Sequence, residues 1–451
     1  MNYFHLLWNL YQQKRNTRKT KQQIELLQKR KLDKMLCYAY EHSPYYRKVF
    51  ETAGITVDNI RKTPLCNFPT LNKELLMEHF DDLVTDRSLK QEELLRFDEQ
   101  STDGAETYLG KYHIVHSSGS TGTPRYFVYD NAAWEQMLLG IIRGALWDLS
   151  MPGILKLLAG KPRILYIAAT DGRYGGAMAV SDGIKGVRAE QRFLDINTPL
   201  TKWIGTVQNF KPNILIGYPS AIKILAELLE TEDSFLEIKR VISCGEPLSS
   251  GLRQYFERTF KTTVLNFYGA SESLALGVEQ QADGGMFLFD DLNVVEVIDG
   301  EMYLTCLYNF TQPLIRYHIS DHLVLRESEQ DDICSFTNAD ILLCRDEDVL
   351  WFETKNGRKE YLHPLSIEGL CIEGLLDYQF CQTSKNSFEM IAEISTMSVG
   401  KEISNEIKKQ METLLFKNGL ADIQFSVRFV EQIMPDIRTG KKSLIVEENE
   451  I

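Results

Sequence analysis

The chain has 451 residues, of which 43% are hydrophobic and 25% charged, and its formal net charge is −13. This length predicts two or three domains, and the acidic balance argues against a nucleic-acid binder that uses a broad basic face. No apolar run approaches the roughly 20 residues that span a bilayer, and the first residues lack the order of charge and apolarity of a signal peptide. We therefore expect a cytoplasmic protein with no transmembrane segment and no nucleic-acid partner.

The N-terminal region has a helical pattern over residues 11–40, and its segment 14–34 carries nine lysines and arginines against two acids. Such a face could dock on a membrane surface or a partner, or it could be a solvated basic face on an acidic protein. A polar loop is expected at 96–110. The eight cysteines form no C-x-x-C pair, so neither a zinc ribbon nor a redox couple is indicated.

A loop rich in hydroxyl groups and glycine is the first motif that carries chemistry. Glycines let backbone N–H groups converge on an anion, while hydroxyls and a terminal cation add further donors. The spacing differs from a Walker A loop, since no Gly-Lys-Ser/Thr follows. The β-prone run 126–129 predicts a strand after the loop. The polyphosphate-binding candidates are Ser117, Ser118, Gly119, Ser120, Thr121, Gly122, Thr123 and Arg125.

Strand-like and helical runs alternate from about 112 to 325, which predicts an α/β domain with a buried parallel sheet. The expected strands are Arg163–Ala168, Ile214–Gly217, Val241–Cys244 and Val264–Phe267, and the expected helices are 131–149, 220–230 and 249–260. Beyond 285 the strands Asn293–Val297 and Glu301–Cys306 alternate in polarity, which predicts a separate antiparallel piece.

A charged break at 345–348 precedes a compact α+β unit of about a hundred residues. Its expected strands are Glu389–Ile394 and Gln424–Val430, and its expected helices are 365–376 and 400–416. We therefore predict an N-terminal domain of residues 1–345, with a helical part at 1–110, and a C-terminal domain of residues 346–451.

The second motif, Asn266–Glu272, follows a predicted strand. A carboxylate after a glycine turn at a strand's carboxyl end is well placed to hold Mg²⁺ on a nucleotide phosphate, and Glu272 is that carboxylate. Tyr268 could stack on a base. An ordinary turn with a solvated glutamate is the alternative.

The third motif is Pro313–Asp321. A carboxylate can accept hydrogen bonds from both ribose hydroxyls, which makes Asp321 a candidate for ribose binding. Arg316 could pair with Asp321 or with a phosphate. An edge strand with a surface ion pair is the other interpretation.

The fourth motif is Pro435–Lys442, where Gly440 frees the backbone to present Lys441 as a mobile cation. Solvated charge near a terminus is the other interpretation.

In order and separation these four motifs resemble the adenylate-forming superfamily, which contains acyl-CoA ligases, aryl-acid adenylating enzymes and firefly luciferase. Segments 38–47, 68–73 and 315–317 are most similar to the phenylacetate–CoA ligase branch, which also contains proteins of capsule biosynthesis and coenzyme F390 synthesis. The resemblance implies an α/β fold: a large N-terminal domain of mixed and parallel sheets flanked by helices, and a small mobile α+β C-terminal domain.

The resemblance also implies roles for the motif residues. The loop from Ser117 to Gly122 would wrap the β- and γ-phosphates, Asp321 would hold the ribose, Glu272 would hold Mg²⁺, and Lys441 would bridge the attacking carboxylate and the α-phosphate. Further residues expected beside ATP or AMP are Gly245, Glu246, Pro247, Tyr268, Gly269, Ala270 and Ser271.

Family enzymes rotate the small domain between two half-reactions, and Glu347 aligns with the hinge acid. The rotation would exchange Lys441 for the 355–364 loop. The chain departs from the family pattern in three ways. Arg125 stands where many relatives have lysine, and Ile319 replaces a residue that commonly bears a hydroxyl. Cys344 replaces a glycine, and the loop 349–352 is hydrophobic rather than glycine-rich.

The acyl pocket is expected at Tyr218, Gly176 and Ala177, where aromatic and small residues suit an aryl or medium-sized apolar acid. The implied function is activation of that acid with ATP and Mg²⁺, followed by transfer to coenzyme A or to the phosphopantetheine of an acyl carrier protein. A non-catalytic nucleotide-binding protein in polysaccharide biosynthesis is the alternative of another class. A homodimer is compatible with the sequence, which leaves the oligomeric state open.

Overall fold

The computed structural model describes residues 3–100, 106–116, 125–168, 175–183, 189–196, 198, 200–232, 234–246, 248–281, 284–298, 300–326, 334–342, 350–353, 359–362, 372, 374–394, 400–417, 420–434 and 444–446. Several predicted features lie outside these ranges: the phosphate-loop residues from Ser117 to Thr123, together with Pro247, Cys344, Glu347 and Lys441. Their predicted roles therefore stay predictions.

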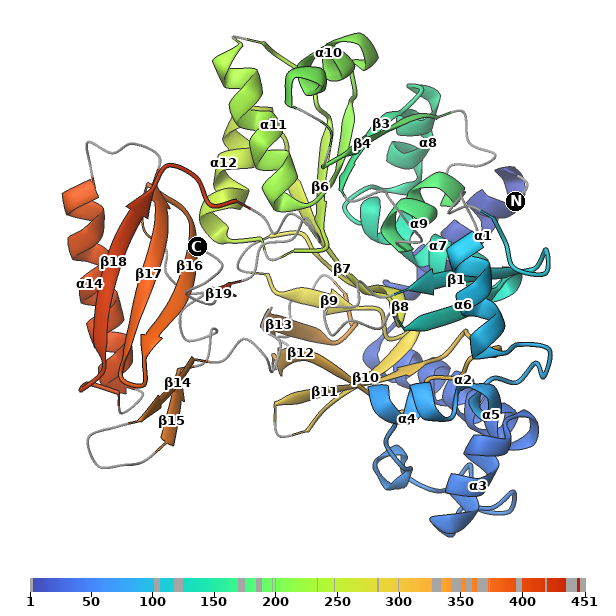
Figure 1. The fold of residues 1–451 in the computed structure, drawn as a ribbon. Helices are drawn as coiled ribbons and strands as arrows, with labels where there is room; N and C mark the ends of the chain where they lie inside the picture. Colours follow the sequence, from blue (N-terminus) through green and yellow to red (C-terminus); the bar gives the residue numbers. More distant parts are fainter. Residues whose placement is uncertain are drawn as a thin grey trace.

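An eleven-stranded sheet forms the centre of the molecule, with the strand order β10-β11-β12-β13-β9-β8-β7-β6-β5-β3-β4 (Figure 1). Its parallel part consists of β3 (Arg163–Ala168), β4 (Glu190–Asp195), β5 (Ile214–Gly217), β6 (Arg240–Cys244) and β7 (Val264–Ala270). The expected parallel strands are thus confirmed. Most are buried apolar runs, as strands covered on both faces require.

The rest of this sheet is antiparallel and comprises β8 (Ser273–Glu279), β9 (Met286–Leu288), β10 (Asn293–Ile298), β11 (Glu301–Cys306), β12 (Tyr317–Leu325) and β13 (Asn338–Leu342). The prediction of a separate antiparallel piece is wrong, because β8 pairs with β7 and continues the same sheet. After β7 the strands pair in antiparallel fashion, but they belong to the same sheet.

Helices cover the parallel part of the sheet. They are α7 (Asn131–Ala145), α8 (Met151–Ala159), α9 (Gly175–Gly183), α10 (Leu200–Phe210), α11 (Pro219–Thr231) and α12 (Ser250–Phe260). The expected helices at 131–149, 220–230 and 249–260 are confirmed with small differences at their ends. A hairpin of β1 (Tyr112–His116) and β2 (Tyr126–Asp130) flanks the phosphate loop on both sides and includes the predicted strand.

The N-terminal region is helical, with α1 (Tyr3–Asn16), α2 (Lys21–His42), α3 (Pro44–Thr52), the 3₁₀ turn η1 (Leu65–Asn67), α4 (Lys73–Glu78), α5 (Phe80–Leu83) and α6 (Gln91–Gln100). The single helix expected over 11–40 is two helices, because Thr20 accepts a hydrogen bond from Gln23 N and starts a new helix with a capping box. The polar loop expected at 96–110 begins too early, since α6 extends to Gln100.

The C-terminal region forms its own sheet in the order β18-β17-β16-β19, with α14 (Gly400–Lys417) beside it (Figure 1). Its strands are β16 (Leu375–Ser384), β17 (Ser387–Ile394), β18 (Gln424–Val430) and β19 (Ile445–Val446), preceded by the hairpin β14 (Leu350–Glu353) and β15 (Lys359–Leu362). A separate cluster of buried side chains, including Phe380, Met390 and Ile407, forms its core. The end of the helix expected over 365–376 is wrong, because β16 begins at Leu375.

Within the described part of the chain, no helix is both long enough and apolar enough to cross a lipid bilayer.

Candidate functional site

Several of the predicted site residues in the described ranges lie where the parallel strands end. The order β4-β3-β5-β6-β7 reverses direction between β3 and β5, and ligands of open α/β sheets bind beyond the carboxyl ends of the strands at such a switch point. Tyr218 follows β5, Gly245 follows β6, Gly269 and Ala270 end β7, and Gly176 lies in α9 after β3. The fold therefore gathers at one sheet edge residues that are far apart in sequence.

Glu272 lies in the tight turn between β7 and β8, and its side chain is buried. The Tyr129 hydroxyl fixes this turn by donating to the carbonyls of Ser271 at 2.8 Å and of Glu272 at 3.0 Å. The Arg125 Nη1 atom lies 3.8 Å from Glu272 Oε1 and donates to the Tyr317 hydroxyl at 3.4 Å. A carboxylate and a guanidinium thus lie close together beside the start of β2.

Tyr268 and Asp321 meet directly. The Tyr268 hydroxyl, on β7, donates a hydrogen bond to Asp321 Oδ2 on β12 at 2.6 Å. Tyr268 is buried, whereas Asp321 is partly accessible, which leaves acceptor capacity on the carboxylate for a ligand. The second and third motifs, which were identified separately in the sequence, therefore lie in direct contact through these two residues.

Glu246 has a structural role besides its predicted place beside a nucleotide. Its carboxylate accepts hydrogen bonds from Ser220 N at 3.0 Å and Ser220 Oγ at 2.9 Å, so it satisfies the amino terminus of α11. The preceding Gly245 has a φ of +82°, which a residue with a Cβ rarely adopts, and a Cβ there would lie 2.7 Å from the Tyr218 ring. Both features fix the turn after β6 against Tyr218.

A group of aromatic and small residues lies at the predicted acyl position. Tyr166 on β3 and Tyr218 are buried, and a Cβ added to Gly176 would overlap the Tyr166 hydroxyl. Burial raises the pKa of Tyr166 well above its usual value, with nearby Cys244 and Tyr218 acting in the same direction. Tyr166 is therefore a neutral phenol, and Ala177 follows in the same helix with its side chain half-buried.

Arg316 does not pair with Asp321. It is buried, has a φ of +48°, and donates through Nε to Glu296 Oε2 at 2.9 Å. Its Nη1 donates to the carbonyls of Cys66 at 2.8 Å and Phe68 at 2.6 Å. The predicted Arg316–Asp321 pair is wrong, because the guanidinium ties the N-terminal helical region to the sheet.

Sequence reasoning missed three tyrosines and a serine that build the site: Tyr129, Tyr166, Tyr317 and Ser220. Tyr129 and Tyr317 each stood within a quoted motif, but only the fold shows that their hydroxyls meet the 271–272 turn and Arg125. Nothing in the local sequence distinguishes Tyr166 from a core aromatic residue.

No group of three His, Cys, Asp or Glu residues in the described ranges could hold a metal ion by itself. Mg²⁺ on a nucleotide needs fewer protein ligands, because it binds through one or two carboxylates and the phosphates and keeps several waters. The Glu272 carboxylate fits that requirement. The nearby Arg125 guanidinium is a positive group suited to phosphate.

Comparison with known proteins agrees with this geometry. A family profile described as "AMP-binding enzyme" matches residues 73–287. The phenylacetate-coenzyme A ligase of Escherichia coli (strain K12) is 24% identical over 326 residues, which cover 66% of this chain and 66% of that protein. The chain therefore spans slightly less than two thirds of the length of that relative. Protein CapK of Staphylococcus aureus is 23% identical, with 93% of this chain and 88% of CapK covered.

Among solved structures, a 2-hydroxyisobutyryl-CoA ligase in its postadenylation state has a TM-score of 0.71 at 18% identity, and the match covers 97% of this chain and 92% of that one. This likeness extends the shared fold through the C-terminal region. Residues 73–287 thus match the AMP-binding enzyme family, and the curated proteins that this chain is similar to include phenylacetate-coenzyme A ligases and CapK.

Proposed function

We propose that the chain is an AMP-forming acid–thiol ligase. A carboxylate oxygen of the acid attacks the α-phosphorus of ATP, and the bond to the β-phosphate oxygen breaks, which gives acyl-AMP and pyrophosphate. A thiol sulfur then attacks the acyl carbon, AMP leaves, and the thiol proton passes to solvent. Coenzyme A is the proposed acceptor, with the phosphopantetheine of a carrier protein as its variant.

The observation that supports this most directly is the hydrogen bond between Tyr268 and Asp321, which are 53 residues apart. Tyr268 was predicted to flank a base and Asp321 to hold a ribose, so their contact supports one shared place for the two parts of a nucleoside. In the proposal Asp321 accepts from the ribose hydroxyls, and Tyr268 orients that carboxylate. In the proposal Gly245, Glu246, Pro247, Gly269, Ala270 and Ser271 would lie beside the nucleotide, as the resemblance implies.

Glu272 would hold Mg²⁺, and the ion would offset the charge of the phosphates when it is bound. Arg125 stands 3.8 Å from Glu272 and serves as a fixed cation for the same phosphates. In the proposal, the loop Ser117–Gly122 and Thr123 bind the β- and γ-phosphates, as the resemblance implies.

Lys441 is proposed to stabilise the charge that builds between the carboxylate and the α-phosphate in the first step. The C-terminal region would then turn about Glu347 and exchange Lys441 for the 355–364 loop. The acid would be an aryl or medium-sized apolar acid, because Tyr166 and Tyr218 are buried aromatic groups beside Gly176 and Ala177.

The test is exchange of labelled pyrophosphate into ATP across a panel of aryl and aliphatic acids. Lys441→Ala should lower acid-dependent exchange by about 10²–10³-fold, because a preorganised cation is lost from the transition state. Lys442→Ala is the matched control, since it removes the same charge from the adjacent position, and it should exchange like the unmodified protein. If ATP binds and no acid supports exchange, the non-catalytic nucleotide-binding alternative takes the place of this proposal.

The acceptor is a separate question. Pre-formed acyl-AMP should be consumed faster when coenzyme A is added if coenzyme A is the acceptor. Consumption that responds only to a phosphopantetheine-bearing carrier protein would assign the carrier variant instead.

A further inference from the structure

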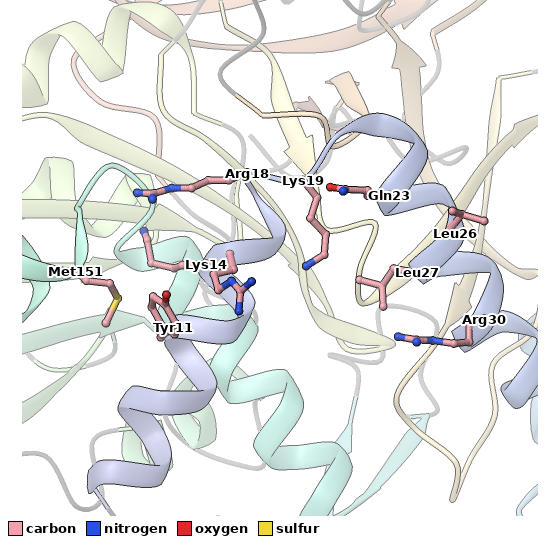
Figure 2. A pocket seen from close by; sticks show the side chains of 10 residues that line it. Tyr11, Lys14, Arg18, Lys19, Gln23, Leu26, Leu27, Arg30 and Met151 are labelled. Carbon is pink, nitrogen blue, oxygen red and sulfur yellow. The ribbon is translucent and has the colours of Figure 1, made fainter.

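A second pocket lies away from the candidate nucleotide site, between α1, α2 and the start of α8 (Figure 2). Its volume is about 750 Å³, which falls within the range of small-molecule sites. It is lined by Tyr11, Lys14, Arg15, Arg18, Lys19, Gln23, Leu26, Leu27, Arg30 and Met151. Five of these ten residues are cationic and none is acidic, although the whole chain carries a net charge of −13.

Arg15, Arg18 and Arg30 are exposed, and in the described part of the chain none of them forms an ion pair with a carboxylate. Burial lowers the pKa of Lys14 to about 8, and the charges of Arg143 and Arg18 act in the same direction although Asp148 opposes them. Like charges held together in a concave site repel one another, and an anion between them would remove that cost.

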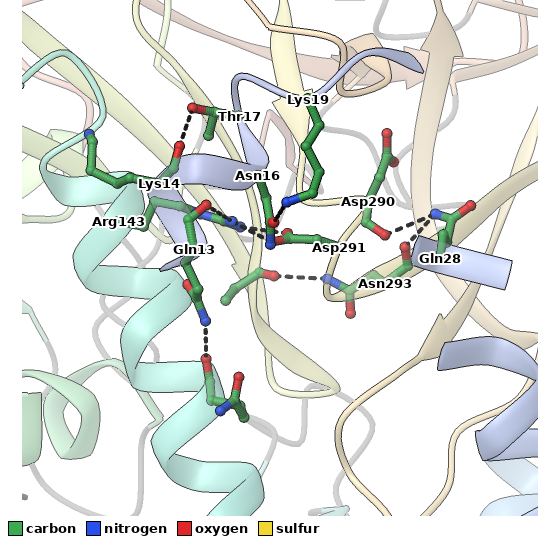
Figure 3. A network of polar contacts seen from close by, with 12 residues as sticks. Gln13, Lys14, Asn16, Thr17, Lys19, Gln28, Arg143, Asp290, Asp291 and Asn293 are labelled. Carbon is green, nitrogen blue, oxygen red and sulfur yellow. Dashed lines mark hydrogen bonds and ion pairs between the residues drawn. The ribbon is translucent and has the colours of Figure 1, made fainter. Parts of the chain in front are cut away.

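The walls of this pocket are fixed by a buried polar network at the turn from α1 to α2 (Figure 3). Arg143 donates to both carboxylate oxygens of Asp291, at 2.6 and 2.9 Å, and Asn16 donates to the same carboxylate at 2.7 Å. Lys19 Nζ donates to Asn16 Oδ1 at 2.6 Å. The network therefore holds the end of α1 and the lysine at the pocket's edge in one arrangement.

Two further contacts anchor the helices on either side. Lys14 Nζ donates to the carbonyls of Leu146 at 2.8 Å and Trp147 at 3.1 Å, which fixes α1 to the end of α7. On α2, Gln28 Nε2 donates to the carbonyls of Asp290 and Asn293. These anchors fix the helices that carry the three arginines, and a preformed pocket reduces the entropic cost of binding.

The pocket also has apolar lining, which comes from α1 and α8 on one side and from α2 on the other (Figure 2). Tyr11, Leu26, Leu27 and Met151 contribute carbon surface, and Leu26 is 63% exposed. Trp8, next to Tyr11 along α1 with ring centroids 6.0 Å apart, is 60% exposed. A ligand that matched this lining would combine concentrated negative charge with an apolar group.

We propose that this pocket binds a multiply charged phosphate group that carries an apolar substituent. Guanidinium groups pair with phosphate oxygens through two parallel hydrogen bonds, which suits Arg15, Arg18 and Arg30 to that charge. A soluble phosphate ester and the headgroup of an anionic lipid share this chemistry. The site is independent of the proposed ligase reaction, because its residues lie on α1, α2, the turn between them and α8, and none belongs to the nucleotide site.

The experiment uses the full chain and the double variant Arg18→Gln/Arg30→Gln. The probes are inorganic tripolyphosphate, titrated by calorimetry, and vesicles of phosphatidylcholine with or without phosphatidic acid, followed by co-sedimentation. The matched control is Arg192→Gln/Arg258→Gln, which removes two exposed guanidinium groups from β4 and α12. Tripolyphosphate that binds at the nucleotide site contributes equally to all three proteins, so the difference between them reports on this pocket.

We expect the double variant to bind one of these probes about 100-fold more weakly than the unmodified chain, at roughly tenfold for each charged hydrogen-bonding group removed. The control should bind like the unmodified chain, and acid-dependent exchange should be the same in all three. A selective loss of tripolyphosphate assigns a soluble phosphate, and a selective loss of anionic vesicles assigns a lipid headgroup. Equal binding by all three proteins, or binding of neither probe by the unmodified chain, overturns the proposal.

Discussion

Asp321 offers the sharpest test of the nucleoside site, because its carboxylate already accepts from Tyr268 at 2.6 Å and is partly accessible. Asp321→Asn keeps the shape of the side chain but replaces one acceptor oxygen by a donor. We expect the KM for ATP to rise about tenfold or more, since a hydrogen bond to a charged group is lost. Initial rates at varied ATP measure this. An unchanged KM would mean that Asp321 does not bind the ribose.

Asp290 gives the protein a pH-dependent stability. Burial raises its pKa from 3.8 to about 6, although Thr337 N donates to its carboxylate. Because the folded-state pKa is raised, the stabilising contribution is fully present below about pH 4 and is lost as the pH rises through about 6. The difference between the two pKa values corresponds to about 3 kcal/mol.

The variant Asp290→Asn tests this directly. Its side-chain oxygen can still accept from Thr337, but it carries no charge to bury. We expect its free energy of unfolding in urea to exceed that of the unmodified protein at pH 8, and the two to converge near pH 4. A constant difference between them across this range would show that Asp290 does not titrate as described.

Arg316 shows where residue-level prediction stops. The sequence places it five positions before Asp321, which made a pair plausible, but its φ of +48° and its bonds to Glu296 and two carbonyls direct it elsewhere. No short-range pattern could indicate partners at residues 66 and 68. The contact between Tyr268 and Asp321 depends on strand pairing in the same way.

At the scale of elements, helix α11 joins the two regions of the molecule through a buried ion pair. Lys223 on α11 contacts Glu393 on β17, and both side chains are almost completely buried. The other oxygen of Glu393 accepts from Ile433 N at 2.9 Å. Removing one member of such a pair leaves a buried charge without its partner.

We therefore predict that Lys223→Met lowers the free energy of unfolding by about 3–5 kcal/mol. Glu393→Gln in the same chain should recover part of this loss, because the amide is neutral and its oxygen can still accept from Ile433. A double-mutant cycle by urea unfolding measures the coupling. Simple additivity of the two substitutions would contradict a direct ion pair.

Short apolar strands were the elements that the sequence located best. Arg163–Ala168, Ile214–Gly217 and Glu301–Cys306 have the predicted bounds, since each is a short run flanked by turn or charged residues. The break between α1 and α2 was missed because it is made by the capping box of Thr20 and Gln23. This cap leaves the helical spacing of the apolar residues almost unchanged. Helix α6 was missed because only Leu94 of its residues is buried.

At the scale of the whole molecule, local sequence could not show that one sheet holds both strand types. The pairing of β9 with β13 joins Phe287 to Asn338, and no local signal marks such a distant register. The charge is also distributed unevenly: a chain of net charge −13 gathers five cations around one pocket on α1 and α2. The sequence located these cations in the basic segment 14–34, but it could not show that they line a pocket.

The central claim, that this fold activates an acid through an adenylate, is tested most directly by the nucleotide product. The purified chain is incubated with ATP, Mg²⁺ and a panel of acids without any thiol, and the products are separated by chromatography. The account predicts acyl-AMP and an equal amount of pyrophosphate, formed with one class of acid and lost in Lys441→Ala. Formation of ADP and phosphate instead, at a rate that depends on the acid, would contradict it.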